Sequence, residues 1–286
     1  MNVFAIKILA MLSMVIDHLG LSLYREGLIS SGIFSAMRSV GRISFPLFCF
    51  LIVNGYEHSS DRKKYLARLI GFAALSQMPY RLVFERANYA ASAFGAVKFT
   101  APGIVLIVLA VVIAIIWYRF VKADITALLP ALALIVGFST LRAGDYTLLG
   151  GKMNVFYTLA LSLAIMGMLD AALNDKKRDA TFPARAAATV LALIILWDKT
   201  EYGINGIVLI VMLWFFHTNR IQQIAVIVLW SIVQYLVSGQ GLAYFLCASA
   251  SVLPIYFYNG RRGKALKTTF YLVYPLHLLL LGLTGI

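Results

Sequence analysis

The stretch FAIKILAMLSMVIDHLGLSL, residues 4–23, decides the fold class. It is an apolar run of the length that a helix needs to cross the hydrocarbon core of a bilayer, about 20 residues. No small-x-small cleavage site follows it, so we interpret the run as a retained helix and not as a secretory signal. Asp17 and His18 stand side by side near its end, where lipid or packed side chains are expected.

The composition of the whole chain also indicates a membrane protein. Of its 286 residues, 61% are hydrophobic and 13% are charged, and the mean hydropathy is +0.85. Soluble domains carry about 25% charged residues, so a soluble fold is excluded. Apolar runs of this length favour spanning helices over the shorter, alternating strands of a barrel. We expect an all-α polytopic bundle, one domain over residues 1–286, with about eleven transmembrane helices (ten to eleven) near residues 4–23, 43–57, 66–84, 101–118, 125–141, 154–172, 184–198, 203–217, 221–238, 242–258 and 268–284.

The positive charge gathers on one side of this topology. The formal net charge of +13 would also suit a nucleic-acid-binding protein. With a cytoplasmic N-terminus, however, sixteen of the 25 Lys and Arg residues fall in inside segments, most densely at 61–68, 174–185 and 259–267. This is the positive-inside bias, so we expect a lipid bilayer and no nucleic acid as partner. The C-terminus is then expected outside, and Arg38 and Arg42 in an outer segment.

Common catalytic and metal-binding motifs are absent from the sequence. Cys49 and Cys247 lie in apolar runs without partners at metal-ligand spacing, so they indicate neither a disulfide framework nor a metal site. The sequence has no P-loop, dinucleotide fingerprint, zinc-protease pair or nucleophile elbow. We therefore expect no metal, and we look for chemistry among polar residues inside the apolar runs.

Asp17 and His18 are the first such residues. On a helix Asp17 points about 100° away from His18, beside Ser13, so the two side chains cannot face each other. An ionisable group inside a membrane is rare and costly, which makes it a functional candidate by default. The alternative is a helix end that emerges into water, with Asp17 hydrogen-bonded and His18 at the interface.

A second group lies in RSVGRISFPLF, residues 38–48. Arg38 and Arg42 are four residues apart and share a helix face, and Pro46 would free the carbonyl of Arg42. An arginine at the mouth of a kinked helix can hold a carboxylate or a phosphate. The alternative is that both arginines snorkel to the interface beside a packing kink.

A third group lies near the other end of the chain. Tyr274 and His277 are three residues apart, so they line one stripe of the last span, and His277 falls near the middle of the bilayer. His277 is then either a catalytic or substrate-orienting residue, or a neutral histidine that is hydrogen-bonded to a neighbouring helix. Asn154 also suits a simple helix cap, and the segment around Tyr202 a tight outer turn.

These motifs carry a resemblance to a known family. In order, the chain contains IDHLG, GRISFPLFCFLIVNGYEHSSDRKKYLARL, KMNVFYTLAL, EYGINGIVLI and YPLHLLLLGL. This series, with its spacing, resembles the TraX family, named for the F-pilin N-acetylase of conjugative plasmids, and it runs nearly end to end. The matching positions are Asp17, His18, Arg42, Pro46, Asn154, Tyr202, Gly203 and His277.

The resemblance implies a multi-pass protein of the bacterial inner membrane that transfers an acetyl group from cytosolic acetyl-CoA to the N-terminus of a pilin subunit, or to another acceptor at the outer face. We expect His18 to act as general base, Asp17 through its field or a contact with another helix, and His277 as a second proton carrier or acceptor-binding group. The expected substrate-binding residues are Arg42, Asn154, Tyr202 and Tyr274. The donor's phosphates would rest on Arg62, Lys63, Lys64, Arg68, Arg261 and Arg262, although retention charges alone also explain these residues.

Other classes of function remain open at this stage. A transporter would use the same buried ionisable residues to bind ions at mid-membrane. A non-catalytic assembly partner, or another reaction on pilin such as cyclisation, is also compatible with the sequence. The acceptor and the oligomeric state are left open.

Overall fold

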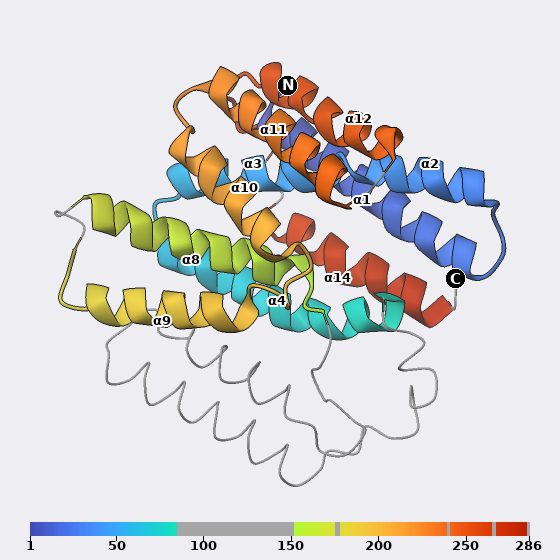
Figure 1. Cartoon of the computed structure of the whole chain (residues 1–286). Helices are drawn as coiled ribbons and strands as arrows, with labels where there is room; N and C mark the ends of the chain where they lie inside the picture. Colours follow the sequence, from blue (N-terminus) through green and yellow to red (C-terminus); the bar gives the residue numbers. More distant parts are fainter. Residues whose placement is uncertain (85–151, 175–177, 239–240, 265–266, 285–286) are drawn as a thin grey trace, which may run out of the picture. The chain divides into compact units, whose positions relative to one another are not determined.

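The computed structural model describes residues 1–84, 152–174, 178–238, 241–264 and 267–284, and these are almost entirely helical (Figure 1). Outside the helices the described residues pair in one isolated bridge, between Met153 and Thr200. The all-α fold class is therefore confirmed for this part of the chain. The helices are α1 (Val3–Arg25), α2 (Ser31–Gly41), α3 (Ser44–Glu57), α4 (Arg62–Phe84), α8 (Val155–Leu173), α9 (Phe182–Leu196), α10 (Gly203–Phe215), α11 (Arg220–Ser238), α12 (Leu242–Ala250), α13 (Val252–Tyr256) and α14 (Lys267–Thr284).

The chain divides into two compact units. The first unit contains residues 1–58, 75–84 and 208–286, and the second contains residues 59–74 and 85–207. The boundary passes through α4 and α10, so each unit is built from segments that are distant in the sequence. The first unit holds both ends of the chain.

Four helical segments are long and apolar enough to cross a membrane: Val3–Arg25, Ser31–Glu57, Val155–Leu173 and Arg220–Val237. Shorter apolar helices cover residues 182–194, 203–215, 242–256 and 270–283. These support a membrane protein, whereas the count of about eleven spans is not confirmed. Two expected spans, 101–118 and 125–141, lie outside the described residues.

The second span begins twelve residues earlier than the sequence suggested. We expected it at 43–57, but α2 adds residues from Ser31, and the two helices form a 27-residue apolar segment. The helical pattern breaks at Arg42 and Ile43, and Pro46 follows in the first turn of α3, where a missing N–H costs no intrahelical bond. Arg38 and Arg42 are therefore inside a spanning segment and not in an outer loop.

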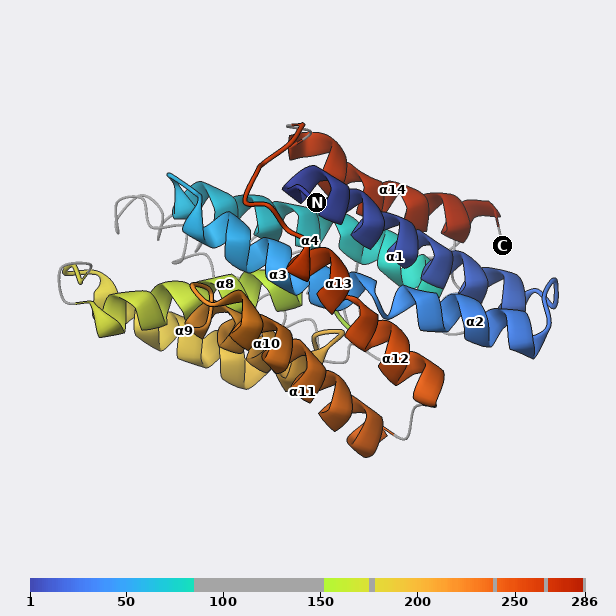
Figure 2. The same ribbon diagram turned by 90° about the horizontal axis from the view of Figure 1, so that it is seen from above.

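Close packing of α1 against α2 forms the centre of the first unit (Figure 2). A Cβ atom at Gly20 would lie 2.7 Å from the Cβ of Met37, and one at Gly41 would lie 2.3 Å from the Cβ of Asp17. Small residues at a helix contact let the two backbones approach, which is how helices associate in membranes. Glycine is thus needed on both helices for this contact.

The segment after α13 binds the start of the chain by backbone hydrogen bonds. The N–H of Val3 donates to the carbonyl of Arg261 at 2.9 Å, and the N–H of Asn259 donates to the carbonyl of Met1 at 2.8 Å. Farther along, α14 packs beside α1, and a Cβ at Gly282 would lie 2.7 Å from the Cβ of Leu82 in α4. The last helix is therefore held against the first.

In the second unit, backbone hydrogen bonds join the start of the motif KMNVFYTLAL to the start of the motif EYGINGIVLI. The N–H of Met153 donates to the carbonyl of Lys199, and the N–H of Glu201 donates to the carbonyl of Met153, both at 2.8 Å. The buried helix α8 starts directly after this bridge. At the other end of α8, Arg62 forms an ion pair with Asp170 at 2.6 Å.

The packing at Gly41 gives a stability test. Gly41→Ala forces Asp17 and α1 to move, so we expect it to lower the stability in detergent by about 1–3 kcal/mol, the usual cost of overpacking. Gly32→Ala is the matched control on the same helix, because its Cβ would have only the Ser30 hydroxyl nearby, at 3.9 Å. Alanine there should be neutral or mildly stabilising. Equal thermal unfolding midpoints for the two variants would contradict the close contact.

Candidate active site in the first unit

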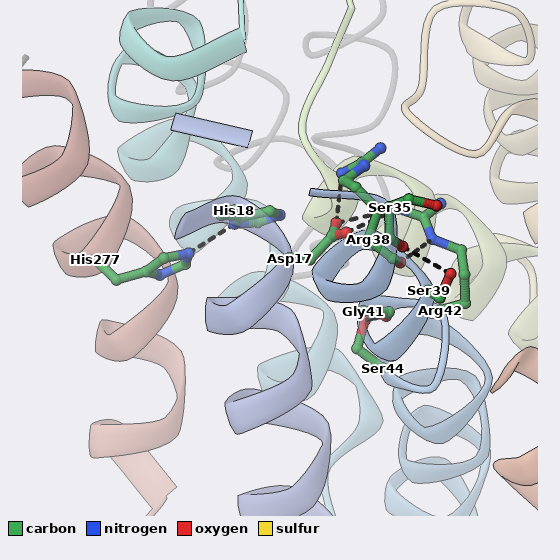
Figure 3. A network of polar contacts seen from close by, with 9 residues as sticks. All are labelled: Asp17, His18, Ser35, Arg38, Ser39, Gly41, Arg42, Ser44 and His277. Carbon is green, nitrogen blue, oxygen red and sulfur yellow. Dashed lines mark hydrogen bonds and ion pairs between the residues drawn. The ribbon is translucent and has the colours of Figure 1, made fainter. Parts of the chain in front are cut away.

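The histidines of the first and last helices face each other. His18 on α1 and His277 on α14 approach to 2.7 Å between Nδ1 and Nε2, with ring planes only 12° apart (Figure 3). His18 is 5% exposed. Polar side chains of the first and last helices therefore meet inside the first unit, although they are 259 positions apart in the sequence.

The hydrogen bonds around these rings define which nitrogen of His18 is basic. Nδ1 of His277 lies 2.8 Å from the carbonyl of Val273, which can only accept, so this nitrogen carries a proton. With both rings neutral, Nε2 of His277 is then an acceptor, and Nδ1–H of His18 donates to it. The lone pair of His18 is left on Nε2, which has no hydrogen-bond partner among the residues that the structure describes. This nitrogen is available to take a proton.

Aromatic rings surround the histidine pair. Tyr274, one turn before His277, lies with its ring centre 6.3 Å from that of His18 and 5.7 Å from that of His277. Phe84, at the end of α4, meets His18 edge to face at 5.0 Å. The expected stripe of Tyr274 and His277 is thus present, and Phe84 was not foreseen. The rings limit the access of water to the pair.

Asp17 points to the other side of α1 and binds two arginines (Figure 3). Nη1 of Arg38 donates to Oδ2 of Asp17 at 2.7 Å, and Nη2 of Arg42 donates to both carboxylate oxygens at 3.1 and 3.2 Å. The side chains of Asp17, Arg38 and Arg42 are 10%, 23% and 19% exposed. Asp17 therefore acts through a contact with another helix and not by pairing with His18, as the helical phase predicted.

This cluster lies deeper than the sequence suggested. By helical rise, Asp17 is about 5 Å from the midpoint of α1, and Arg38 and Arg42 are within about 9 Å of the midpoint of the 27-residue segment. Whether these side chains lie within the bilayer or reach its interface stays a prediction. Arg38 was not among the expected site residues, although its spacing to Arg42 was the signal that could have included it.

Two guanidinium groups share the carboxylate of Asp17. Arg42 also lies over the ring of Tyr244, 5.6 Å from its centre, in a cation–π contact. A buried positive site of this kind stabilises an oxyanion or holds a carboxylate. Tyr244 and Gly41, which permits the approach of Asp17, were not foreseen, because each depends on a contact distant in the sequence.

Asn154 and Tyr202 belong to the second unit. Asn154 is fully buried, its Oδ1 accepts from the N–H of Phe156, and its Nδ2 donates to the carbonyl of Ala73 at 2.8 Å. The helix-cap interpretation of Asn154 is confirmed. Tyr202 is half-buried and precedes Gly203, whose φ of +53° favours glycine. A substrate-binding role for either residue stays a prediction.

The expected donor-binding residues divide between the units. In the second unit, Arg62 is paired with Asp170, Arg68 lies over the ring of Tyr65, and Lys63 and Lys64 are exposed. In the first unit, Arg261 and Arg262 are exposed, beside the start of α1. Their role as phosphate ligands stays a prediction. His58 and His217 both lie at one cavity of the first unit.

The Asp17 cluster predicts a strong charge effect on stability. Asp17→Asn removes the carboxylate that Arg38 and Arg42 share, and breaking a buried pair typically costs about 3–5 kcal/mol. We expect a large fall in the unfolding midpoint of the purified protein in detergent. The double variant Asp17→Asn/Arg42→Gln, which removes one positive charge as well, should recover part of the loss. A double variant that is no more stable than Asp17→Asn would show that the charge balance is unimportant.

Comparisons with known proteins identify the family of this chain. The family model described as TraX protein matches residues 3–150 and 138–284. The probable fimbrial assembly protein FimC, serogroup H1, of Dichelobacter nodosus is 29% identical over 206 residues, covering 68% of this chain and 80% of that protein. The uncharacterized protein RP591 of Rickettsia prowazekii (strain Madrid E) is 35% identical over 81 residues, 28% of each chain. No solved structure matches the chain. Because the family model covers nearly all of the sequence, the chain belongs to the TraX protein family.

Proposed function

We propose that this protein is a membrane-embedded acetyltransferase that moves an acetyl group from acetyl-CoA to an amine, the N-terminus of a pilin subunit. The observation that carries the proposal is the His277–His18 pair, which leaves a basic nitrogen on His18 inside a spanning bundle. Membership in the TraX family supports a role in pilin modification. The relative named as a probable fimbrial assembly protein supports the pilus as its setting.

In this proposal His18 is the general base. The acceptor nitrogen attacks the thioester carbonyl, Nε2 of His18 takes the proton that the amine loses, a C–N bond forms and the C–S bond breaks. The leaving thiolate receives this proton from Nε2 of His18 and departs as the thiol of coenzyme A, so that His18 is neutral again. Nδ1–H of His18 remains bonded to His277, so the second histidine helps to accommodate the charge that develops on the first. Proton transfer of this kind contributes about 10²–10⁴ in rate.

The positive cluster behind His18 supplies the electrostatic part of the mechanism. An oxyanion forms on the thioester carbonyl during the attack, and a preorganised positive charge lowers its energy. Arg42 is our candidate for this role, with Asp17 as the residue that positions its guanidinium. Arg38 shares the same carboxylate.

The donor and the acceptor are proposed to come from opposite faces of the inner membrane. Acetyl-CoA is cytoplasmic and too polar to cross, whereas a processed pilin N-terminus is available at the outer face. The N-terminus of the chain, with the exposed Arg261 and Arg262 beside it, is placed on the cytoplasmic side in this topology. The basic clusters at Arg62–Arg68 and at Arg261 and Arg262 remain candidate contacts of the donor.

The direct test is the removal of the base. We expect His18→Ala to abolish acetyl transfer to pilin peptide, a loss of at least about 10²-fold, because the variant lacks the nitrogen that accepts the proton of the amine. The unfolding midpoint and gel-filtration profile in detergent should stay close to those of the parent protein. Normal turnover by the variant would remove His18 from the mechanism.

The role of His277 is tested by two variants that differ in hydrogen bonding. In His277→Gln the amide oxygen can still accept from Nδ1–H of His18. In His277→Ala the side chain offers no acceptor to this N–H group. We expect kcat to fall strongly in the alanine variant and to be largely restored by glutamine, with little change in KM for acetyl-CoA. Equal kcat values for the two variants would show that the histidine pair does not orient the base.

The reaction itself is identified by the mass of the product. Pilin from cells that contain the protein should be heavier by one acetyl group than pilin from cells that lack it. Loss of one water would instead indicate cyclisation, and unchanged mass would contradict any covalent modification of pilin. Current or uptake in proteoliposomes without acetyl-CoA would favour a transporter.

A further inference from the structure

A cavity with both apolar and polar side chains in its wall lies in the first unit, near the start of the chain. It has a volume of about 240 Å³ and is lined by the C-terminal end of α3, the turn between α10 and α11, and Tyr258 after α13. The neighbouring residues of this last segment bind the start of the chain, since Asn259 donates to the carbonyl of Met1. Thirteen residues separate Glu57 at the cavity from Ser44, near the arginine cluster, which is about 20 Å of helix.

Arg220 gives this cavity a positive charge that is not neutralised by an ion pair. Its Nη1 donates to the carbonyl of Tyr258, and the guanidinium lies over the Tyr258 ring, 5.1 Å from its centre. No carboxylate within the described residues forms an ion pair with Arg220. A guanidinium has five N–H donors in a planar fork, and one bond to a carbonyl leaves several of them for a ligand.

The other polar groups favour an anion as ligand. Asn54 donates to the hydroxyl oxygen of Tyr258 at 3.3 Å, which leaves the Tyr258 proton to be donated elsewhere, and Thr218 adds a second hydroxyl to the lining. Arg220 is also the first residue of α11, where the helix dipole attracts negative charge. A phosphate group can use all of these donors at once.

Glu57 is the one carboxylate among the lining residues, and its charge is already engaged. Its Oε1 accepts from the indole N–H of Trp214 at 2.8 Å. Its Oε2 lies 3.8 Å from Nε2 of His217, whose Nδ1 donates to the carbonyl of Trp214 at 2.7 Å. Among the described contacts, Glu57 therefore orders the wall of the cavity and forms no ion pair with Arg220.

We propose that this cavity binds the phosphorylated, nucleotide end of a thioester acyl donor, the end of acetyl-CoA that stays in the cytosol. Arg220 holds the phosphates, Tyr258 and Thr218 donate to them, and Phe50 and Val53 give an apolar wall for the rest of the ligand. Arg261 and Arg262, three and four residues after Tyr258, add exposed positive charge at the same end. The identity of the ligand rests on the proposed acetyltransferase function, whereas the site for a phosphate rests on the cavity itself.

The binding test uses the full chain in detergent with coenzyme A as probe and calorimetry as readout. We expect saturable binding that inorganic pyrophosphate displaces, and an affinity at least tenfold weaker in Arg220→Gln. Arg25→Gln is the matched control, because Arg25 also donates to a backbone carbonyl, that of Val83, but at the opposite end of α1. A loss of affinity that is equal in the two variants, or no displacement by pyrophosphate, would overturn the site.

A kinetic test separates this inference from the proposed function. Arg220→Gln should raise KM for acetyl-CoA at least tenfold with little change in kcat, the opposite of the pattern expected for His18. If the parent protein transfers acetyl groups and Arg220→Gln leaves KM unchanged, the cavity is not the donor site and the function stands. If coenzyme A binds in an Arg220-dependent manner but no acetyl group is transferred, the site stands and the acetyltransferase does not.

Thr218→Val, which keeps the shape of the side chain, should weaken coenzyme A binding without unfolding the protein. Unchanged binding would count against the phosphate contact.

Discussion

The ion pairs of Asp17 with Arg38 and Arg42 are the interaction on which the first unit depends. Charged side chains in the middle of spanning helices are tolerated only when they are paired, so α1 and α2 are held together at this level. Glycine at position 41 is what allows the carboxylate to reach both guanidinium groups. The pairing fixes the rotation of α1 about its axis. Because successive residues on a helix differ by 100°, fixing Asp17 also directs His18 towards the opposite side, where α14 lies.

The surroundings of His18 determine which of its ring nitrogens carries the proton. On one side it is held by His277, whose own proton is committed to the carbonyl of Val273, and around it lie aromatic rings. A histidine in such surroundings is held in one tautomer by its hydrogen bonds and not by a carboxylate, in contrast to the Ser-His-Asp arrangement. The adjacent aspartate is instead used to neutralise arginines. Two neighbouring residues thus serve two different electrostatic tasks, because the helix turns them to different partners.

Much of this could be predicted from the sequence, and the limits have physical causes. Hydropathy indicated helices and their rough positions, and the helical phase separated Asp17 from His18. The contact of His18 with His277 was expected only in outline, because it joins residues 259 positions apart and no local pattern encodes which helices become neighbours. The start of the second span was wrong because α2 contains serines, glycines and an arginine, which lower its hydropathy, yet these same residues allow close packing and hold Asp17.

His217 shows the same limit at the second cavity. In the sequence it stands in a polar turn between two apolar runs, which is where an exposed histidine is most ordinary. Its position becomes informative only through Trp214, which binds both the histidine and Glu57 and so brings the end of α3 to the start of α11. The first unit therefore contains two candidate sites: the cavity at its end and the histidine pair near its middle. A ligand with a highly charged end and a neutral reactive end fits this separation, because only the reactive end has to leave the aqueous face.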